Sequence, residues 1–178
     1  MDKDEGREGM WYAVRTMEGE EEAVKRRVGE MAPRESGWEC RVLYCIHKKR
    51  YLGEWHEERE RLLPGYLFFV ADGPEPVSGV LGRITGYAGL AGEGMEACPV
   101  EREEEELLER LAGGTEEIGM SYGVIRNGVL KVKEGALVGL EGAVRKIDRH
   151  KRKGYINLSF PGMEKKLVGI GLEVTEKS

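Results

Sequence analysis

The spacing of apolar residues changes character about two thirds of the way along the 178-residue chain. Up to about residue 112, stretches of alternating apolar and polar residues take turns with stretches in which apolar residues recur every three or four positions. This is the pattern of strands alternating with helices. Beyond about residue 129 the helical spacing disappears, and short strand patterns follow one another between turn residues. The chain is therefore expected to fold as two modules of different class.

The expected fold class is α+β, with an α/β sandwich followed by a small SH3-like β-barrel. In the first module, strand patterns run over residues 10–16, 38–46 and 64–70, with a weaker edge strand at 87–92. Helical spacing runs over residues 17–31, 77–84 and 100–114, and the polar stretch 47–63 is expected to form a long hairpin. The helices should flank a mixed sheet.

The second module is expected to contain five short strands. Their patterns run over residues 130–138, 142–148, 154–160, 165–170 and 172–176. The predicted organisation is a disordered tail at 1–9, an α/β domain at 10–112, a flexible linker at 113–122 and a β-barrel domain at 123–178.

Charge is distributed unevenly along the chain, although the net charge is only −5. Residues 1–122 carry 16 Lys/Arg against 27 Asp/Glu, whereas residues 123–178 carry 12 against 6. An acidic part followed by a basic part is typical of modules that bind different partners. A ribosomal protein would be basic throughout to neutralise rRNA, so the acidic first part argues against that class.

The densest group of cations lies in a turn of the second module. Six Lys/Arg occupy the nine positions 145–153, and a smaller basic and aromatic cluster lies at 47–51. Cations on a protruding hairpin match nucleic-acid phosphates, and aromatic or guanidinium planes stack on unpaired RNA bases. A protein contact and a merely solvated turn are the alternatives. The candidate RNA-binding residues are His47, Lys48, Lys49, Arg50, Tyr51, Arg145, Lys146, Arg149, His150, Lys151, Arg152 and Lys153.

Other classes of protein are disfavoured by what the sequence lacks. No stretch of about 18 apolar residues exists and the N-terminus has no apolar signal segment, so a cytoplasmic location is expected. Cys40, Cys45 and His47 lack the repeated spacing of a zinc site, and buried thiols are the preferred interpretation. The acidic cluster around His56 would suit acid–base chemistry, but no enzyme motif accompanies it. We expect neither an enzyme nor a bound metal or cofactor.

Two parts of the sequence resemble a family of transcription factors. WYAVRT (11–16), the helix after it and LLPGYLFFV (62–70) are similar to the amino-terminal domain of NusG-type transcription elongation factors. EGALVGLEGAVRKIDRHKRKGYINL (134–158) is similar to the KOW motif of the family's carboxy-terminal barrel. IGMSYGVI (118–125) and VGIGLEV (168–174) further resemble the LoaP-type processive antiterminators. The resemblance covers residues 10–176.

The resemblance implies a docking surface for RNA polymerase. In this family the amino-terminal domain presents an apolar depression to the clamp helices of the polymerase's largest subunit. By motif position, the resemblance implies Trp11, Tyr12, Leu63, Pro64, Tyr66 and Phe68 as polymerase-binding residues. Plain core packing is the alternative for Trp11 and Phe68. Tyr66 suits an interface better because a tyrosine can keep one polar edge there.

Together these features predict a monomeric, non-catalytic transcription elongation regulator. It would bind RNA polymerase and promote processive antitermination after recruitment by a hairpin in nascent leader RNA. One alternative is a general NusG-like elongation or pausing factor that couples polymerase to the ribosome, with the barrel contacting a small-subunit ribosomal protein. Another is a ribosome-associated KOW protein.

Overall fold

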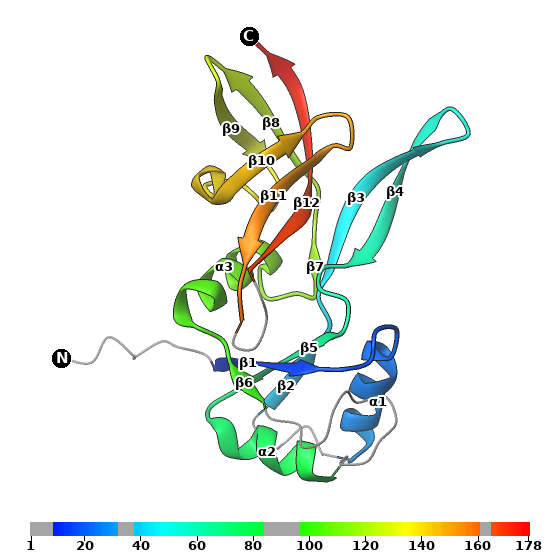
Figure 1. Ribbon diagram of the computed structural model, residues 1–178, viewed down its shortest axis with the longest axis vertical. Helices are drawn as coiled ribbons and strands as arrows, with labels where there is room; N and C mark the ends of the chain where they lie inside the picture. Colours follow the sequence, from blue (N-terminus) through cyan, green and yellow to red (C-terminus); the bar gives the residue numbers. More distant parts are fainter. Residues whose placement is uncertain (1–8, 32–37, 84–96, 161–164) are drawn as a thin grey trace, which may run out of the picture. The chain divides into compact units, whose positions relative to one another are not determined.

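The computed structural model of the chain describes residues 9–31, 38–83, 97–160 and 165–178. Within these ranges the backbone forms helices α1 to α3 and strands β1 to β12, labelled in chain order in Figure 1. The chain divides into two compact units. Unit 1 comprises residues 1–42, 64–105 and 160–162, and unit 2 comprises residues 43–63, 106–159 and 163–178. The expected α+β class is confirmed.

Unit 1 is built on a four-stranded sheet in the order β2-β5-β1-β6. Its strands are β1 (Met10–Arg15), β2 (Trp38–Arg41), β5 (Tyr66–Ala71) and β6 (Cys98–Pro99). Every described pairing in this sheet is antiparallel. Residues 11–14 of β1 are all buried, so this central strand shows a continuous apolar run in place of an alternating one. The parallel pairings that a mixed sheet requires occur in unit 2 instead.

Two helices pack on β5 of this sheet, α1 (Glu21–Met31) and α2 (Pro74–Arg83). Val24 and Val28, one turn apart on α1, are fully buried, as the helical spacing predicts. Pro74 occupies the first position of α2, where its missing N–H leaves no hydrogen bond unmade. The apolar faces of both helices therefore close the core of unit 1.

A buried carboxylate connects the start of α1 to the turn before β5. Glu21 is fully buried, and its oxygens accept hydrogen bonds from the amides of Gly19 at 3.0 Å and Gly65 at 2.6 Å. Gly65 has a φ of +86°, a conformation that favours glycine. An acidic residue in the first helical turn also suits the helix dipole.

Unit 2 contains two sheets. The three-stranded sheet has the order β4-β3-β7, with β3 (Tyr44–Tyr51), β4 (Glu54–Arg61) and β7 (Glu117–Ile118). The five-stranded sheet has the order β10-β11-β12-β8-β9 and comprises β8 (Ser121–Arg126), β9 (Val129–Glu134), β10 (Val144–Asp148), β11 (Lys153–Leu158) and β12 (Lys166–Lys177). β12 pairs with β11 over its first half and with β8 over its second. This one long strand therefore joins the β10–β11 hairpin to the β8–β9 hairpin. It also contacts β3.

The structure places several boundaries differently from the sequence patterns. The strand expected at 38–46 is interrupted at Val42 and Leu43, and its two parts, β2 and β3, belong to different units. The strands expected at 165–170 and 172–176 are the single strand β12. The edge strand expected at 87–92 and the tail at 1–8 lie outside the described residues.

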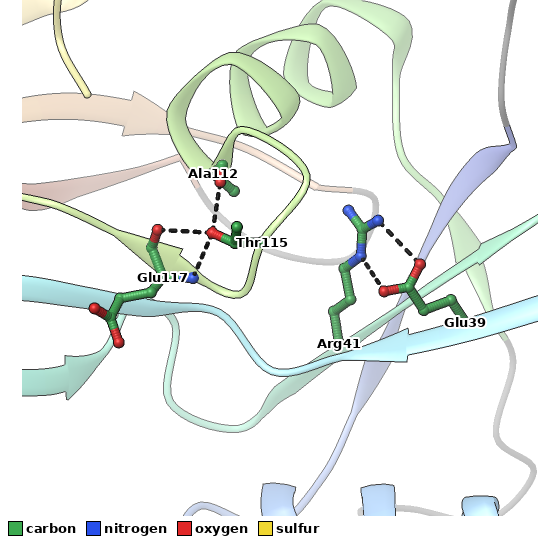
Figure 2. A network of polar contacts seen from close by, with 5 residues as sticks. All are labelled: Glu39, Arg41, Ala112, Thr115 and Glu117. Carbon is green, nitrogen blue, oxygen red and sulfur yellow. Dashed lines mark hydrogen bonds and ion pairs between the residues drawn. The ribbon is translucent and has the colours of Figure 1, made fainter. Parts of the chain in front are cut away.

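The stretch 113–122, expected to be a flexible linker, contains regular structure. The hydroxyl of Thr115 donates a hydrogen bond to the carbonyl of Ala112 at 2.7 Å and accepts one from the amide of Glu117 at 3.2 Å, as Figure 2 shows. The next residues form β7, where Ile118 is fully buried and β3 is the parallel partner. The end of α3 (Arg102–Ala112) therefore leads by a short turn into a paired strand.

Candidate nucleic-acid interface

A groove of about 340 Å³ in unit 2 collects cations from two segments that lie about 100 residues apart in the sequence. One segment is the hairpin formed by β3 and β4, drawn in cyan in Figure 1, and the other is the orange hairpin formed by β10 and β11. The residues that line the groove are His47, Lys48, Lys49, Arg50, Trp55, Glu60, His150, Lys151 and Lys153.

The β3–β4 hairpin positions the first group of cations. Its register places Lys49 opposite His56 and Arg50 opposite Trp55. The strands are joined by Leu52 and Gly53, whose φ values of +53° and +77° belong to the tight turns that match the twist of a hairpin. Leu52 is 93% exposed at the tip.

The β10–β11 turn positions the second group. The side chain of Asp148 accepts a hydrogen bond from the amide of Lys151 at 3.0 Å, which shapes the turn and lowers the pKa of Asp148. Arg152 follows with a φ of +52°, an uncommon conformation for a residue other than glycine. Lys153 then begins β11.

One carboxylate connects a cation from each hairpin. Glu173 on β12 lies 2.8 Å from Nζ of Lys48 and 3.1 Å from Nη1 of Arg152. The hydrogen bond to Glu173 raises the pKa of Lys48, so this lysine stays charged at neutral pH. The guanidinium of Arg152 also lies 3.7 Å from the centre of the Trp55 ring. These contacts hold the two hairpins in place at the groove.

The remaining cations of the groove are not neutralised in this way. Lys49 and Glu58 approach only to 4.0 Å, and both side chains are partly exposed. Within the described ranges Arg50, Lys151 and Lys153 form no ion pair. The groove therefore keeps excess positive charge, which suits a polyanion whose counterions are released on binding.

Some of the predicted RNA-binding residues do not line this groove. Tyr51 is 43% exposed near the hairpin tip and stacks on His56, with ring centres 3.8 Å apart. On β10, Arg145 and Lys146 are exposed, and Nζ of Lys146 lies 5.6 Å from the centre of a tyrosine ring on β11. Arg149 is exposed in the β10–β11 turn.

Three contributors to the groove are not predicted by the basic pattern of the sequence: Trp55, Glu60 and Glu173. A large aromatic residue in the otherwise charged strand β4 is the signal that could have pointed to Trp55. Glu173 has no comparable signal, because its role depends on which side chains of unit 2 lie beside β12.

A small group of possible metal ligands includes two residues that line the groove. Ligand atoms of His47, Glu58 and Glu60 lie within 4.8 Å of one another, and Nε2 of His47 is 3.3 Å from Oε1 of Glu60. Imidazole and carboxylate groups of this kind could hold a divalent cation. Cys40 and Cys45 are buried thiols that form no disulfide.

Most residues implied as the polymerase-binding surface lie in the interior. Trp11, Tyr12, Leu63 and Phe68 are at most 3% exposed and lie among the core residues of this structure. In unit 1 the ring centres of Trp11 and Phe68 lie 5.6 Å apart, and Phe160 packs 5.5 Å from Phe68. The other two residues remain accessible, Pro64 being exposed and Tyr66 partly exposed.

The family described as "Transcription termination factor nusG" matches residues 9–109, which is more than half of the chain. The chain belongs to the NusG family. Among the described residues of this NusG-family chain, no helix has the length and apolar character needed to span a bilayer.

Two curated relatives are named "Transcription termination/antitermination protein NusG". The protein of Halalkalibacterium halodurans is 27% identical over 163 residues, covering 86% of this chain and 90% of the relative. The protein of Thermus thermophilus is 26% identical over 168 residues, covering 86% and 91%. A solved structure titled "Domain interaction in Thermotoga maritima NusG" aligns with a TM-score of 0.46 at 23% identity, covering 92% of this chain and 93% of that one. The family match and the two curated relatives confirm the NusG part of the resemblance, and the LoaP-type specialisation stays a prediction.

Proposed function

We propose that this protein is a transcription regulator that binds RNA polymerase through unit 1 and promotes processive antitermination after recruitment by a hairpin in nascent leader RNA. Membership of the NusG family supports the link to transcription. The convergence of two distant basic segments on one groove supports the RNA contact. Solvation explains a single basic turn, but it does not explain why Glu173 holds a cation from each hairpin beside the groove.

The groove offers the two kinds of contact that unpaired RNA needs. Lys49, Arg50 and Lys151 are exposed cations for phosphates. The guanidinium of Arg152 covers one face of the Trp55 ring at 3.7 Å from its centre, so the planar guanidinium provides the stacking surface for a base. Loops and bulges of an RNA hairpin present such bases, which is why we favour a hairpin over a regular duplex.

The action on polymerase would be non-catalytic. A factor that binds one conformational state of the elongation complex more tightly shifts the population toward that state. For the docking surface we retain Pro64 and Tyr66, because both are accessible. The polymerase contact and the RNA contact are thereby assigned to different units.

Transcription in vitro tests the proposal. Purified polymerase is run through a terminator placed downstream of the protein's own operon leader, with and without that leader. Terminator readthrough that depends on the leader supports RNA recruitment. Readthrough or pausing that ignores the leader would instead indicate a general elongation factor, and the groove would then not be a recruitment site.

A pair of matched variants tests the groove itself. Reversing Lys49 and Arg50 to glutamate should weaken binding of leader RNA roughly 20- to 100-fold, because each lost phosphate contact reduces the counterion-release term. Lys48 is left unchanged, since its ion pair with Glu173 would be replaced by repulsion. The control reverses Lys131 and Lys133, which are exposed on β9 of the same unit and do not line the groove. Equal RNA affinity of the two variants at fixed salt would contradict the assignment.

A further inference from the structure

We propose that the carboxylate of Glu60 makes the groove selective for an unpaired guanine, an inference that rests on the proposed RNA-binding function. Glu60 is the one carboxylate among the nine residues that line the groove. Its side chain is 52% exposed, so a ligand can reach it. A carboxylate repels phosphate, and an RNA strand can satisfy it only by presenting hydrogen-bond donors. Such donors are found on the edges of bases.

The position of Glu60 places it where a bound strand would pass. It also lines a second hollow of about 180 Å³, which shares His47 and Lys153 with the groove and continues toward residues 166–169 at the start of β12. The two hollows therefore form adjoining parts of one surface, with Glu60 where they meet. Lys153, present in both, is available to a phosphate on either side.

A buried histidine orients this carboxylate. His47 is 4% exposed, and its Nε2 lies 3.3 Å from Oε1 of Glu60. A carboxylate has about four lone-pair positions for hydrogen-bond donors. The contact with His47 involves Oε1 alone, and within the described ranges Oε2 of Glu60 accepts no hydrogen bond. His47 is thus a positioning residue that leaves the outer face of the carboxylate available to a ligand.

Guanine is the base whose donor pattern fits this acceptor. Its Watson–Crick edge carries two adjacent donors, N1–H and the N2 amino group, which can meet the two oxygens of one carboxylate. Bidentate contacts to a charged acceptor are stronger and more specific than single ones. Adenine, cytosine and uracil each place an acceptor next to the donor on that edge, and the acceptor would face the negative charge. These edges are exposed only in unpaired bases.

The stacking surface and the carboxylate belong to different positions of the groove. Trp55 and Glu60 lie five residues apart on β4, and both line the groove. The cations of β3 pair alongside this stretch. A short single strand can therefore stack one base on the guanidinium of Arg152 that covers Trp55 and place a guanine at Glu60, with its phosphates on the neighbouring cations.

Fluorescence anisotropy with short labelled RNAs tests the inference on the full chain. The probes are an oligouridine and three versions of it in which one central base is guanine, inosine or adenine. The unmodified protein should bind the guanine probe about tenfold more tightly than the adenine or all-uridine probe. Inosine lacks the N2 amino group and should fall between them. This comparison of probes uses only the unmodified protein, so its result does not depend on how a substitution affects folding.

A matched pair of carboxylate variants completes the test. Glu60→Gln should lose most of the guanine preference and bind the all-uridine probe more tightly, because a negative charge leaves the groove. Glu54→Gln removes the same charge from the same strand, at an exposed position outside the groove, and should keep the preference. RNA binding without base preference, or a Glu60→Gln variant that keeps it, overturns the guanine inference alone. Failure of the unmodified protein to bind any probe or its own leader RNA overturns the proposed function as well.

Discussion

The aromatic residues of unit 1 and the basic residues of unit 2 were both singled out by sequence pattern, yet they occupy opposite environments. Four of the six residues implied as a polymerase surface are buried at 3% exposure or less, whereas most of the implied RNA-binding cations are accessible. Apolar side chains gain by leaving water whether a partner or the protein's own core covers them. Lysine and arginine are rarely buried unless they are paired, so their sequence clusters are reliable guides to surface. A basic cluster therefore predicts accessibility better than an aromatic motif predicts an interface.

The largest expected effect concerns the interior position of Phe68. Phe68→Ala removes a fully buried ring that packs between Trp11 and Phe160, and we expect a loss of about 3–5 kcal/mol in the free energy of unfolding. Urea denaturation followed by circular dichroism measures the change. The matched control, Leu52→Ala, truncates a 93% exposed residue and should alter stability by less than about 0.5 kcal/mol. A change in the free energy of unfolding as small as this for Phe68→Ala would show that the Phe68 side chain is exposed and not part of the core.

A smaller effect is expected from freeing the paired cations of the groove. Glu173→Gln removes the charge that Lys48 and Arg152 share, so RNA affinity should rise about threefold at low salt. The dependence of affinity on salt concentration should also become steeper, because an additional cation meets phosphate. Anisotropy titrations at two salt concentrations measure both quantities. Weaker RNA binding would mean that Glu173 matters more for holding the hairpins than for masking charge.

The smallest effect is expected at Tyr12, where burial raises the pKa of the phenol. Its side chain is 2% exposed, and its hydroxyl has no hydrogen-bond partner within the described part of the chain. Tyr12→Phe removes an unsatisfied polar group and should leave the free energy of unfolding within about 1 kcal/mol of the original, or raise it. Thermal unfolding provides the comparison. Destabilisation by more than about 2 kcal/mol would show that the Tyr12 hydroxyl makes a hydrogen bond that stabilises the folded protein.

The local sequence pattern was sufficient to predict where most helices and strands lie, but it was insufficient to predict where some of them begin and end. The strand at Met10–Arg15 lies where its aromatic and β-branched residues place it, and the helices α1 and α3 lie where the helical spacing places them. The division of the 38–46 pattern into β2 and β3, and the fusion of two patterns into β12, have no signal of that kind. In both cases the pairing partners decide the boundary: β2 pairs with β5 whereas β3 pairs with β4, and β12 pairs first with β11 and then with the more distant β8.

The sequence by itself determined the α+β class, the NusG family and the presence of two basic segments, because periodicity, motif and charge are local properties of a chain. Only the tertiary structure decided that Lys49 and Lys151 lie on one groove, that Glu173 masks two of the neighbouring cations, and that Glu60 is the carboxylate among them. These facts depend on the path of β12 between β3 and the β10–β11 hairpin. Contacts between residues distant in sequence arise from the packing of whole elements, and no window of local sequence contains that information.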